Sequence, residues 1–127
     1  MLPLVPLLFC ACPGFGSQTL GGGNSEVPAD PTYVEHVAPI LDAYCAPCHG
    51  ETPSGGAPDY FRLDDYEGDD ARDGAADMAA RIEARATGDT PTMPPAYATQ
   101  PSDIDREILA AWIADGAPYG PDSGGGE

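Results

Sequence analysis

The segment Cys45-Ala46-Pro47-Cys48-His49 constrains this chain more than any other feature of its 127 residues. Two thiols three positions apart lie on the same side of one helical turn, and a histidine directly follows the second thiol. Proteins use this pattern to attach haem: the two sulfurs form thioethers to the vinyl edge of one porphyrin, and the imidazole binds the iron. The motif therefore predicts one haem c joined covalently to Cys45 and Cys48, with His49 as an axial ligand.

Three other chemistries also use paired cysteines. A thioredoxin-like redox pair requires an alternating βαβ pattern, and the sequence around Cys45 shows none. A structural zinc site needs four ligands, and the remaining candidates for it are His36, Cys10 and Cys12. A simple disulfide would leave His49 without a role. These alternatives stay open, but haem attachment is the prediction that accounts for the whole motif.

Residues that interrupt regular structure are frequent, with 16 glycines and 15 prolines. A small domain with this composition builds only a marginal apolar core of its own. A buried porphyrin would supply the missing apolar centre, as structural metals do in other small domains. The composition therefore favours a single domain that folds around a cofactor.

The chain is strongly acidic, with 21 aspartates and glutamates against five arginines, for a formal net charge of −16. Such a surface repels nucleic acid and anionic lipid headgroups and attracts cationic molecules. We therefore expect no binding to nucleic acid, and a redox partner protein with a basic docking surface. The alternative is that the acidity serves only solubility.

The segment 59–77 is the densest part of this charge, with eight carboxylates and only two arginines. A calcium site would need the spacing of an EF-hand loop, and Gly68 is misplaced for a loop that starts at Asp65. We therefore expect a solvated acidic loop, with calcium binding as the alternative.

The N-terminus resembles an export leader, because Met1 to Phe9 form a short apolar run. The following segment, Leu8-Phe9-Cys10-Ala11-Cys12, is similar to a bacterial lipoprotein box. Two outcomes are open: simple cleavage, or a membrane tether through a lipidated Cys12 or Cys10. Either outcome places the protein in the periplasm or on the outer face of the membrane, where haem is joined to such motifs.

The composition divides the chain into four parts. The glycine-rich stretch after the leader predicts a flexible linker, and the glycine-rich C-terminus predicts a disordered tail. The expected boundaries are 1–12 for the leader, 13–31 for the linker, 32–120 for the folded domain and 121–127 for the tail.

Apolar spacing predicts three helices and no strand. The first covers 32–45, and Pro39 is expected to kink it or to divide it in two. The second covers 74–87 and ends at Gly88. The third begins after Ser102 and ends at Gly116. The expected buried positions are Val34, Val37, Ile40, Leu41 and Tyr44 in the first helix, Ala75, Met78, Ala79, Ile82 and Ala86 in the second, and Ile104, Ile108, Leu109, Trp112 and Ile113 in the third.

The iron face opposite His49 decides the chemistry, because a second protein ligand closes it to small molecules. The candidate ligand is Met93, in the segment Pro91-Thr92-Met93-Pro94-Pro95. Its thioether is soft and neutral and favours ferrous iron, and the flanking prolines stiffen the loop that carries it. Met78 and His36 are the weaker alternatives, since each is expected on a helix with another role.

The motifs together resemble a class I cytochrome c domain, and more closely the single-haem modules of exported bacterial proteins. The likeness spans roughly Tyr33 to Pro118. It implies a mostly α fold in which about three helices and long loops wrap round one covalently bound haem, with the first and last helices crossing beside it. It further implies that Trp112 packs near the porphyrin and that Tyr97 reaches a propionate. The blocks that carry it are Pro39-Ile40-Leu41, Cys45 to Gly50, Met93-Pro94-Pro95 and Leu109 to Pro118.

The acidic, lysine-free surface departs from that family, whose familiar soluble members dock through lysines. The expected function is single-electron transfer with His49 and Met93 both bound to iron, and no enzymatic activity of the chain by itself. One alternative is a haem-based ligand-binding or peroxidatic module with a labile sixth site. Another is a haem-bearing accessory subunit of a larger respiratory or dehydrogenase complex.

Overall fold

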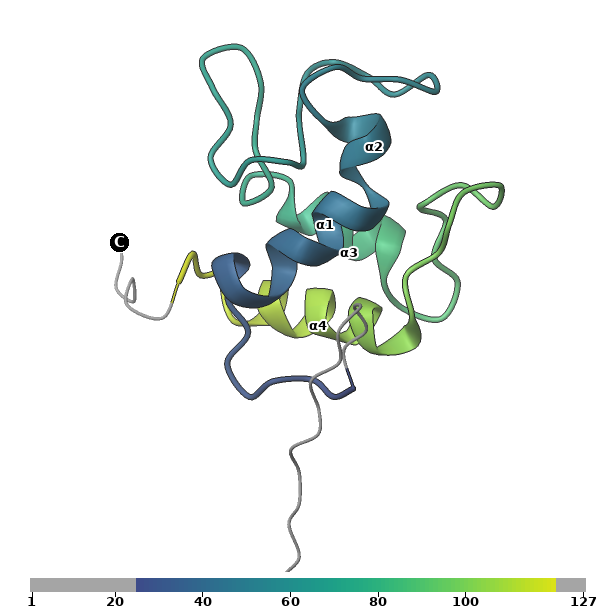
Figure 1. Ribbon diagram of the computed structural model, residues 1–127. Helices are drawn as coiled ribbons and strands as arrows, with labels where there is room; N and C mark the ends of the chain where they lie inside the picture. The colour runs from purple at the N-terminus through teal and green to yellow at the C-terminus, as the bar shows by residue number, and fades with distance from the viewer. Residues whose placement is uncertain (1–24, 121–127) are drawn as a thin grey trace, which may run out of the picture.

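The computed structural model describes residues 25–120, which form short helices joined by long loops (Figure 1). Within these residues the only β pairing consists of isolated bridges, so the predicted mostly α fold is confirmed. The predicted leader (1–12), the linker as far as residue 24 and the tail (121–127) lie outside the described residues. The elements follow in the order η2 (Tyr33–Val37), α1 (Ala38–Tyr44), α2 (Ala46–His49), α3 (Ala79–Ala86) and α4 (Asp103–Ala114).

The first predicted helix is divided near Pro39, as expected. Pro39 lies in the first turn of α1, where its missing N–H breaks no helical bond. Before it, the backbone N–H of Ala38 bonds to the carbonyl of Tyr33 five residues earlier, which makes η2 a wide π-helical turn. A five-residue turn changes the angular phase of the residues it contains. The prediction that Val34 is buried is wrong for this reason: its side chain is 47 % exposed.

The second predicted helix is shorter than 74–87, because α3 begins only at Ala79. The backbone just before it is bonded to the preceding loop: the N–H of Ala75 donates to the carbonyl of Asp65, and that of Ala76 to Tyr66. The chain therefore enters α3 through turns. The expected apolar positions before the helix, Ala75 and Met78, are nevertheless buried.

The third predicted helix is confirmed as α4. The side-chain oxygen of Ser102 accepts from the N–H of Asp105 at 3.0 Å, and the carboxylate of Asp105 accepts from the N–H of Ser102 at 3.2 Å. This reciprocal capping satisfies two N–H groups that a helix start leaves unpaired. After the helix, Gly116 adopts a φ of 95°, a conformation that favours glycine.

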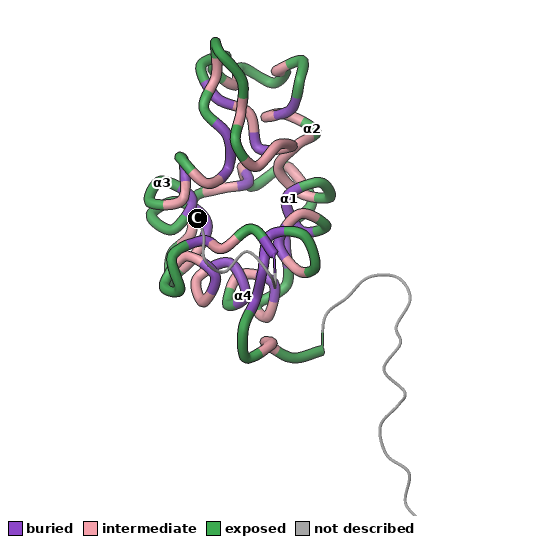
Figure 2. The backbone as a smooth tube through the Cα atoms, turned by 90° about the vertical axis from the view of Figure 1, so that its left-hand side faces the viewer, coloured by how far each residue is buried: buried purple, intermediate pink, exposed green. Residues whose placement is uncertain are grey.

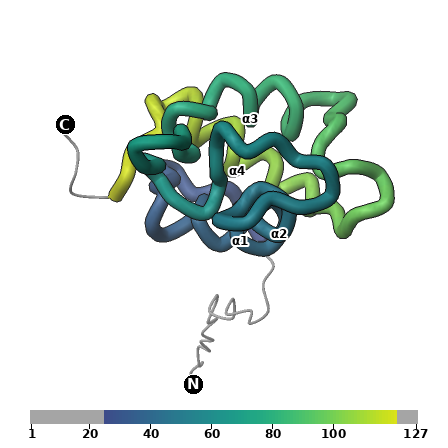
Figure 3. Tube along the Cα trace, turned by 90° about the horizontal axis from the view of Figure 1, so that it is seen from above, coloured from purple at the N-terminus to yellow at the C-terminus, as the bar shows by residue number. Residues whose placement is uncertain are grey.

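Helix α4 forms the base of the domain and contacts both η2 and α3, while α1 leads directly into α2 (Figure 1). Seen from above, α3 lies on one side and α1 with α2 on the other (Figure 3). The buried stretches of the chain lie on the inner side of the domain, where these helices face one another (Figure 2). The largest fully buried side chains are Trp112, Leu41, Ile108, Leu109, Val37 and Pro31.

Two long connections complete the domain. The acidic loop, residues 50–78, joins α2 to α3, and the proline loop, residues 87–102, joins α3 to α4. Part of the predicted linker belongs to the packed domain, because Val27 contacts the core and Pro31 is buried. No helix in residues 25–120 is long and apolar enough to cross a membrane.

Candidate functional site

A cavity of about 450 Å³ opens between α2, α3 and the two long loops. This volume lies in the range of roughly 300–1,000 Å³ that small-molecule and cofactor sites occupy. The residues that line it come from the end of α1, from α2 and α3, and from both loops. Cys45, Cys48, His49 and Met93 are all among them. The structure therefore brings the four predicted haem-binding residues to one cavity.

Helix α2 is a single turn that presents both thiols and the imidazole. The N–H groups of Cys48 and His49 donate to the carbonyl of Cys45 at 3.1 and 2.8 Å. The turn ends at Gly50, where a β-carbon would lie only 2.6 Å from the carbonyl oxygen of Ala46. Only glycine fits at this position without moving the backbone, which explains the glycine directly after the motif.

The imidazole of His49 is held against the acidic loop. Its ring stacks on that of Phe61, with centroids 4.9 Å apart and an interplanar angle of 25°. Burial lowers its pKa, so that the ring is neutral at pH 7, the form in which histidine binds a metal. One nitrogen of this ring, Nδ1, is buried without a hydrogen bond from the described part of the protein, residues 25–120.

The two cysteines are unpaired thiols, both half-buried. Burial raises the pKa of Cys45 to about 11, an effect that the positive charge of Arg106 partly offsets. This thiol is therefore protonated at neutral pH. Reactive redox cysteines have lowered pKa values instead, so the environment of Cys45 argues against the thioredoxin-like alternative.

Two methionines reach the cavity, and their surroundings differ. Met78 belongs to the buried core cluster and is only 7 % exposed. Met93 is half-buried and lies outside that cluster, on the proline loop, where its N–H donates to the carbonyl of Arg85 at 2.8 Å. The sulfur of Met93 is therefore the one without a packing role in the core.

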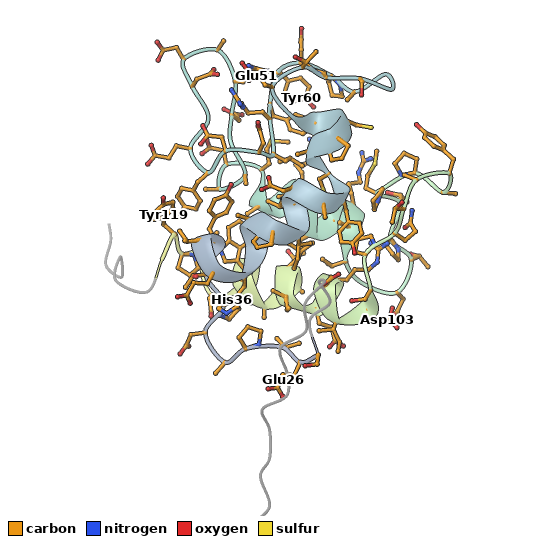
Figure 4. The ribbon with its side chains drawn as sticks, in the orientation of Figure 1. Glu26, His36, Glu51, Tyr60, Asp103 and Tyr119 are labelled. Atoms are coloured by element: carbon orange, nitrogen blue, oxygen red, sulfur yellow. The ribbon has the colours of Figure 1, made fainter. Side chains whose placement is uncertain are left out.

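Of the other residues that the sequence suggested for the haem site, Tyr97 lines the cavity, whereas His36 and Trp112 do not. His36 does not line it: its Nδ1 accepts from the N–H of Thr32 at 3.0 Å, and it lies at the far end of α1 from α2 (Figure 4). Trp112 does not line it either. Its ring packs on that of Tyr33, with centroids 6.2 Å apart, and its Nε1 donates to the carbonyl of Pro118. Tyr97 does line it and is 78 % exposed.

Some residues of the site were not found by the sequence reasoning. Phe61, which stacks on His49, carried no periodic signal because it lies in an irregular loop. Arg81 and Arg85 line the cavity, and no aspartate or glutamate does. Their spacing of one helical turn could have suggested a shared basic face of α3.

Within residues 25–120, no three histidine, cysteine, aspartate or glutamate side chains are grouped so that they could hold a metal ion. The zinc and calcium alternatives thus find no supporting group in this part of the chain. Comparisons with protein-family models, with curated proteins and with solved structures find no match for this chain.

Proposed function

We propose that this protein is a single-electron carrier that binds one haem c in the cavity between α2, α3 and the two loops. One observation carries the proposal: the two thiols and the neutral imidazole of residues 45–49 and the thioether of the distant Met93 line the same cavity. These groups are the donor set of a c-type haem with histidine and methionine ligands. The mostly α fold is compatible with the class I cytochrome c fold that we propose for the domain.

Each of the four residues has its own role in this proposal. Cys45 and Cys48 would hold the group covalently, and His49 and Met93 would be the axial ligands. When bound, the haem supplies an iron centre that accepts and releases one electron. The chain itself keeps His49 neutral and provides a thioether that would favour the reduced state. If His49 and Met93 both hold the iron, the chain would leave no position on the metal for a substrate.

The test of the proposal is to express the full chain with its leader in a host that attaches haem outside the cytoplasm. We expect a coloured protein whose pigment survives extraction with acidified acetone, and a pyridine haemochrome spectrum typical of two thioethers. The double variant Cys45→Ser/Cys48→Ser should lose the covalent pigment. A colourless parent protein, or one whose pigment is extracted, would reject the proposal.

The two methionines give a matched pair for the sixth ligand. Met93→Leu should lower the reduction potential and allow carbon monoxide to bind the reduced protein rapidly. Met78→Leu, a change of similar volume in the same cavity, should leave both properties unaltered. Rapid carbon monoxide binding by the parent protein would instead favour a ligand-binding or peroxidatic module.

The proposed partner is a redox protein with a basic docking surface. The chain carries a net charge of −16, and nine of its carboxylates lie in the acidic loop beside the cavity. Opposite charges speed encounter, and salt screens them. Electron transfer to the natural partner should therefore slow as ionic strength rises. A rate that does not depend on salt would reject electrostatic docking but not the haem.

A further inference from the structure

Arg106 is the side chain that joins α4 to the Met93 segment. It lies in the first turn of α4, and its guanidinium donates three hydrogen bonds. Nη1 donates to the carbonyls of Ala86 and Met93 at 2.8 and 3.0 Å, and Nη2 donates to Oε1 of Gln100 at 2.7 Å. The planar fork of an arginine suits several acceptors at fixed angles. One residue thus ties together the end of α3, Met93 and the end of the proline loop.

Gln100 extends this connection along the proline loop. Its amide nitrogen lies 3.2, 2.9 and 3.1 Å from the carbonyl oxygens of Pro94, Pro95 and Ala98, and its two N–H groups are shared among these three acceptors. Proline has no N–H, so this part of the loop has few backbone donors for bonds of its own. The side chains of Arg106 and Gln100 therefore replace the backbone bonds that would otherwise hold the loop.

The backbone of Met93 is bonded on both sides. Its N–H donates to the carbonyl of Arg85, and its carbonyl accepts from Arg106. Arg106 also pairs with the carbonyl of Ala86, the last residue of α3, where a positive charge is favourable. Hydrogen bonds from a charged donor are stronger than those between neutral groups. The position of Met93 relative to α3 thus depends on its own N–H bond to Arg85 and on the guanidinium of Arg106.

Resting on the proposed function, we infer that Arg106 is a positioning residue for the sixth ligand. It holds the backbone of Met93 so that the thioether stays in the cavity, and Gln100 supports it from the other side of the loop. Removing the guanidinium frees the loop without altering any residue that lines the cavity. Arg106 itself is not among the lining residues.

The experiment compares Arg106→Ala with the parent protein in two measurements. The first is the affinity of the oxidised, haem-loaded protein for imidazole, which must displace Met93. A hydrogen bond to a charged group contributes enough that we expect this affinity to rise roughly ten- to hundredfold. The second is hydrogen exchange at the Met93 amide, which should become faster. Arg106→Lys, with one ammonium in place of the fork, should restore only part of the parent behaviour.

Arg62→Ala is the matched control, because it removes an arginine that bonds to the acidic loop and does not line the cavity. It should leave imidazole affinity and Met93 exchange unchanged. Gln100→Ala, at an exposed position, keeps the bonds of Arg106 to Ala86 and Met93 and should give a smaller rise in affinity than Arg106→Ala. If Arg106→Ala does not fold, the same two measurements are made on Gln100→Ala.

The outcomes separate this inference from the proposed function. Unchanged exchange at Met93 in Arg106→Ala, or in Gln100→Ala if the first does not fold, would overturn the inference whether or not haem is bound. Faster amide exchange at Met93 with unchanged affinity for imidazole would overturn the inference as well. The loop would then be mobile without any weakening of the bond between Met93 and the iron. A parent protein without covalent haem would instead reject the proposed function, and the exchange measurement would still report whether Arg106 holds the loop.

Discussion

The acidic loop and the proline loop both form walls of the cavity, but they are held in different ways. The acidic loop is fixed mainly through its own backbone, with bonds such as Arg62 N–H to the carbonyl of Asp73 at 2.9 Å and Leu63 N–H to that of His49 at 2.6 Å. The proline loop has few such bonds and relies on Arg106 and Gln100. The wall that follows the Cys45–His49 turn is thus held by its own backbone bonds, whereas the wall that carries Met93 is held by two side chains, Arg106 from α4 and Gln100 from the loop itself.

Because the two loops are held differently, we expect them to differ in how well they tolerate substitutions. A loop with bonded backbone withstands most changes to its exposed side chains, since the backbone bonds remain. A loop held by two side chains moves when either is lost. We therefore expect the His49 side of the site to be set by folding, and the Met93 side to be adjustable by single substitutions.

The largest effect should come from the side chain that joins the acidic loop to the site. Phe61 is 8 % exposed and stacks on His49. Phe61→Ala should lower the free energy of unfolding by about 3–5 kcal/mol, because it leaves a cavity in the core. Urea denaturation of the haem-loaded protein measures this. A loss below about 1 kcal/mol would show that the acidic loop does not depend on this contact.

A smaller effect is expected where the acidic loop crosses itself. Gly68 and Gly74 meet at this crossing, and a β-carbon on Gly74 would lie 2.5 Å from the carbonyl oxygen of Tyr66. Gly74→Ala should therefore cost about 2 kcal/mol, because the backbones must separate. Gly88→Ala is the comparison in the proline loop, where a β-carbon has open space but φ is 89°. If Gly74→Ala were the milder of the two, the crossing would not be what fixes the acidic loop.

The burial of Tyr33, together with the carboxylates around it, should also act on stability at high pH. Burial, followed by the charges of Asp42, Asp65 and Asp64, raises the pKa of Tyr33 from 10.0 to about 12. A raised pKa contributes stability that is complete below pH 10 and is lost as pH rises towards 12. The shift corresponds to about 3 kcal/mol before screening by solvent, and we expect about 1 kcal/mol to remain.

Tyr33→Phe provides the measurement for this pH effect. The melting temperature of the parent protein should fall between pH 10 and pH 12, and that of Tyr33→Phe should fall less. Parallel curves for the two proteins would mean that Tyr33 does not couple the acidic loop to pH. Arg62→Ala, which leaves Tyr33 in place, should follow the parent curve.

The smallest effect should come from the ion pairs on the acidic loop. Arg62 pairs with Asp64 at 2.7 Å and with Asp69 at 3.5 Å, near the surface. Arg62→Ala should lower the free energy of unfolding by less than about 1 kcal/mol, since exposed pairs contribute little. Thermal unfolding at low and high salt measures this. A larger loss would mean that side chains hold this loop too, and the contrast with the proline loop would disappear.

The local parts of the structure could be predicted from the sequence. The cap and stop of α4, the single turn of the attachment motif and the division at Pro39 all follow from residues close in the chain. The prediction that four residues share one site also holds as geometry, since Cys45, Cys48, His49 and Met93 line one cavity. Their chemistry remains a proposal.

Other parts depend on contacts between distant residues and could not be predicted. The late start of α3 follows from the backbone bond of Ala75 to Asp65, ten residues earlier in the acidic loop. The exposure of Val34 follows from the wide turn of η2, which apolar spacing does not reveal. Arg106 gave no signal, because helical spacing places it off the apolar face of α4, where a solvated charge is the usual expectation. Its acceptors come from the end of α3 and the proline loop, which no local pattern connects to it.

The capping of α4 has a consequence for the far side of the cavity. Arg106 follows Asp105 directly, and its own N–H bonds to the carbonyl of Ser102 at 3.1 Å. Helices open first at their ends, and the paired bonds of Ser102 and Asp105 make such opening rarer. If Arg106 positions Met93 as inferred above, we expect each opening of this terminal turn to release the Met93 segment as well. Loss of the Ser102 hydroxyl should make such openings more frequent, and faster amide exchange at Arg106 in Ser102→Ala would reveal it.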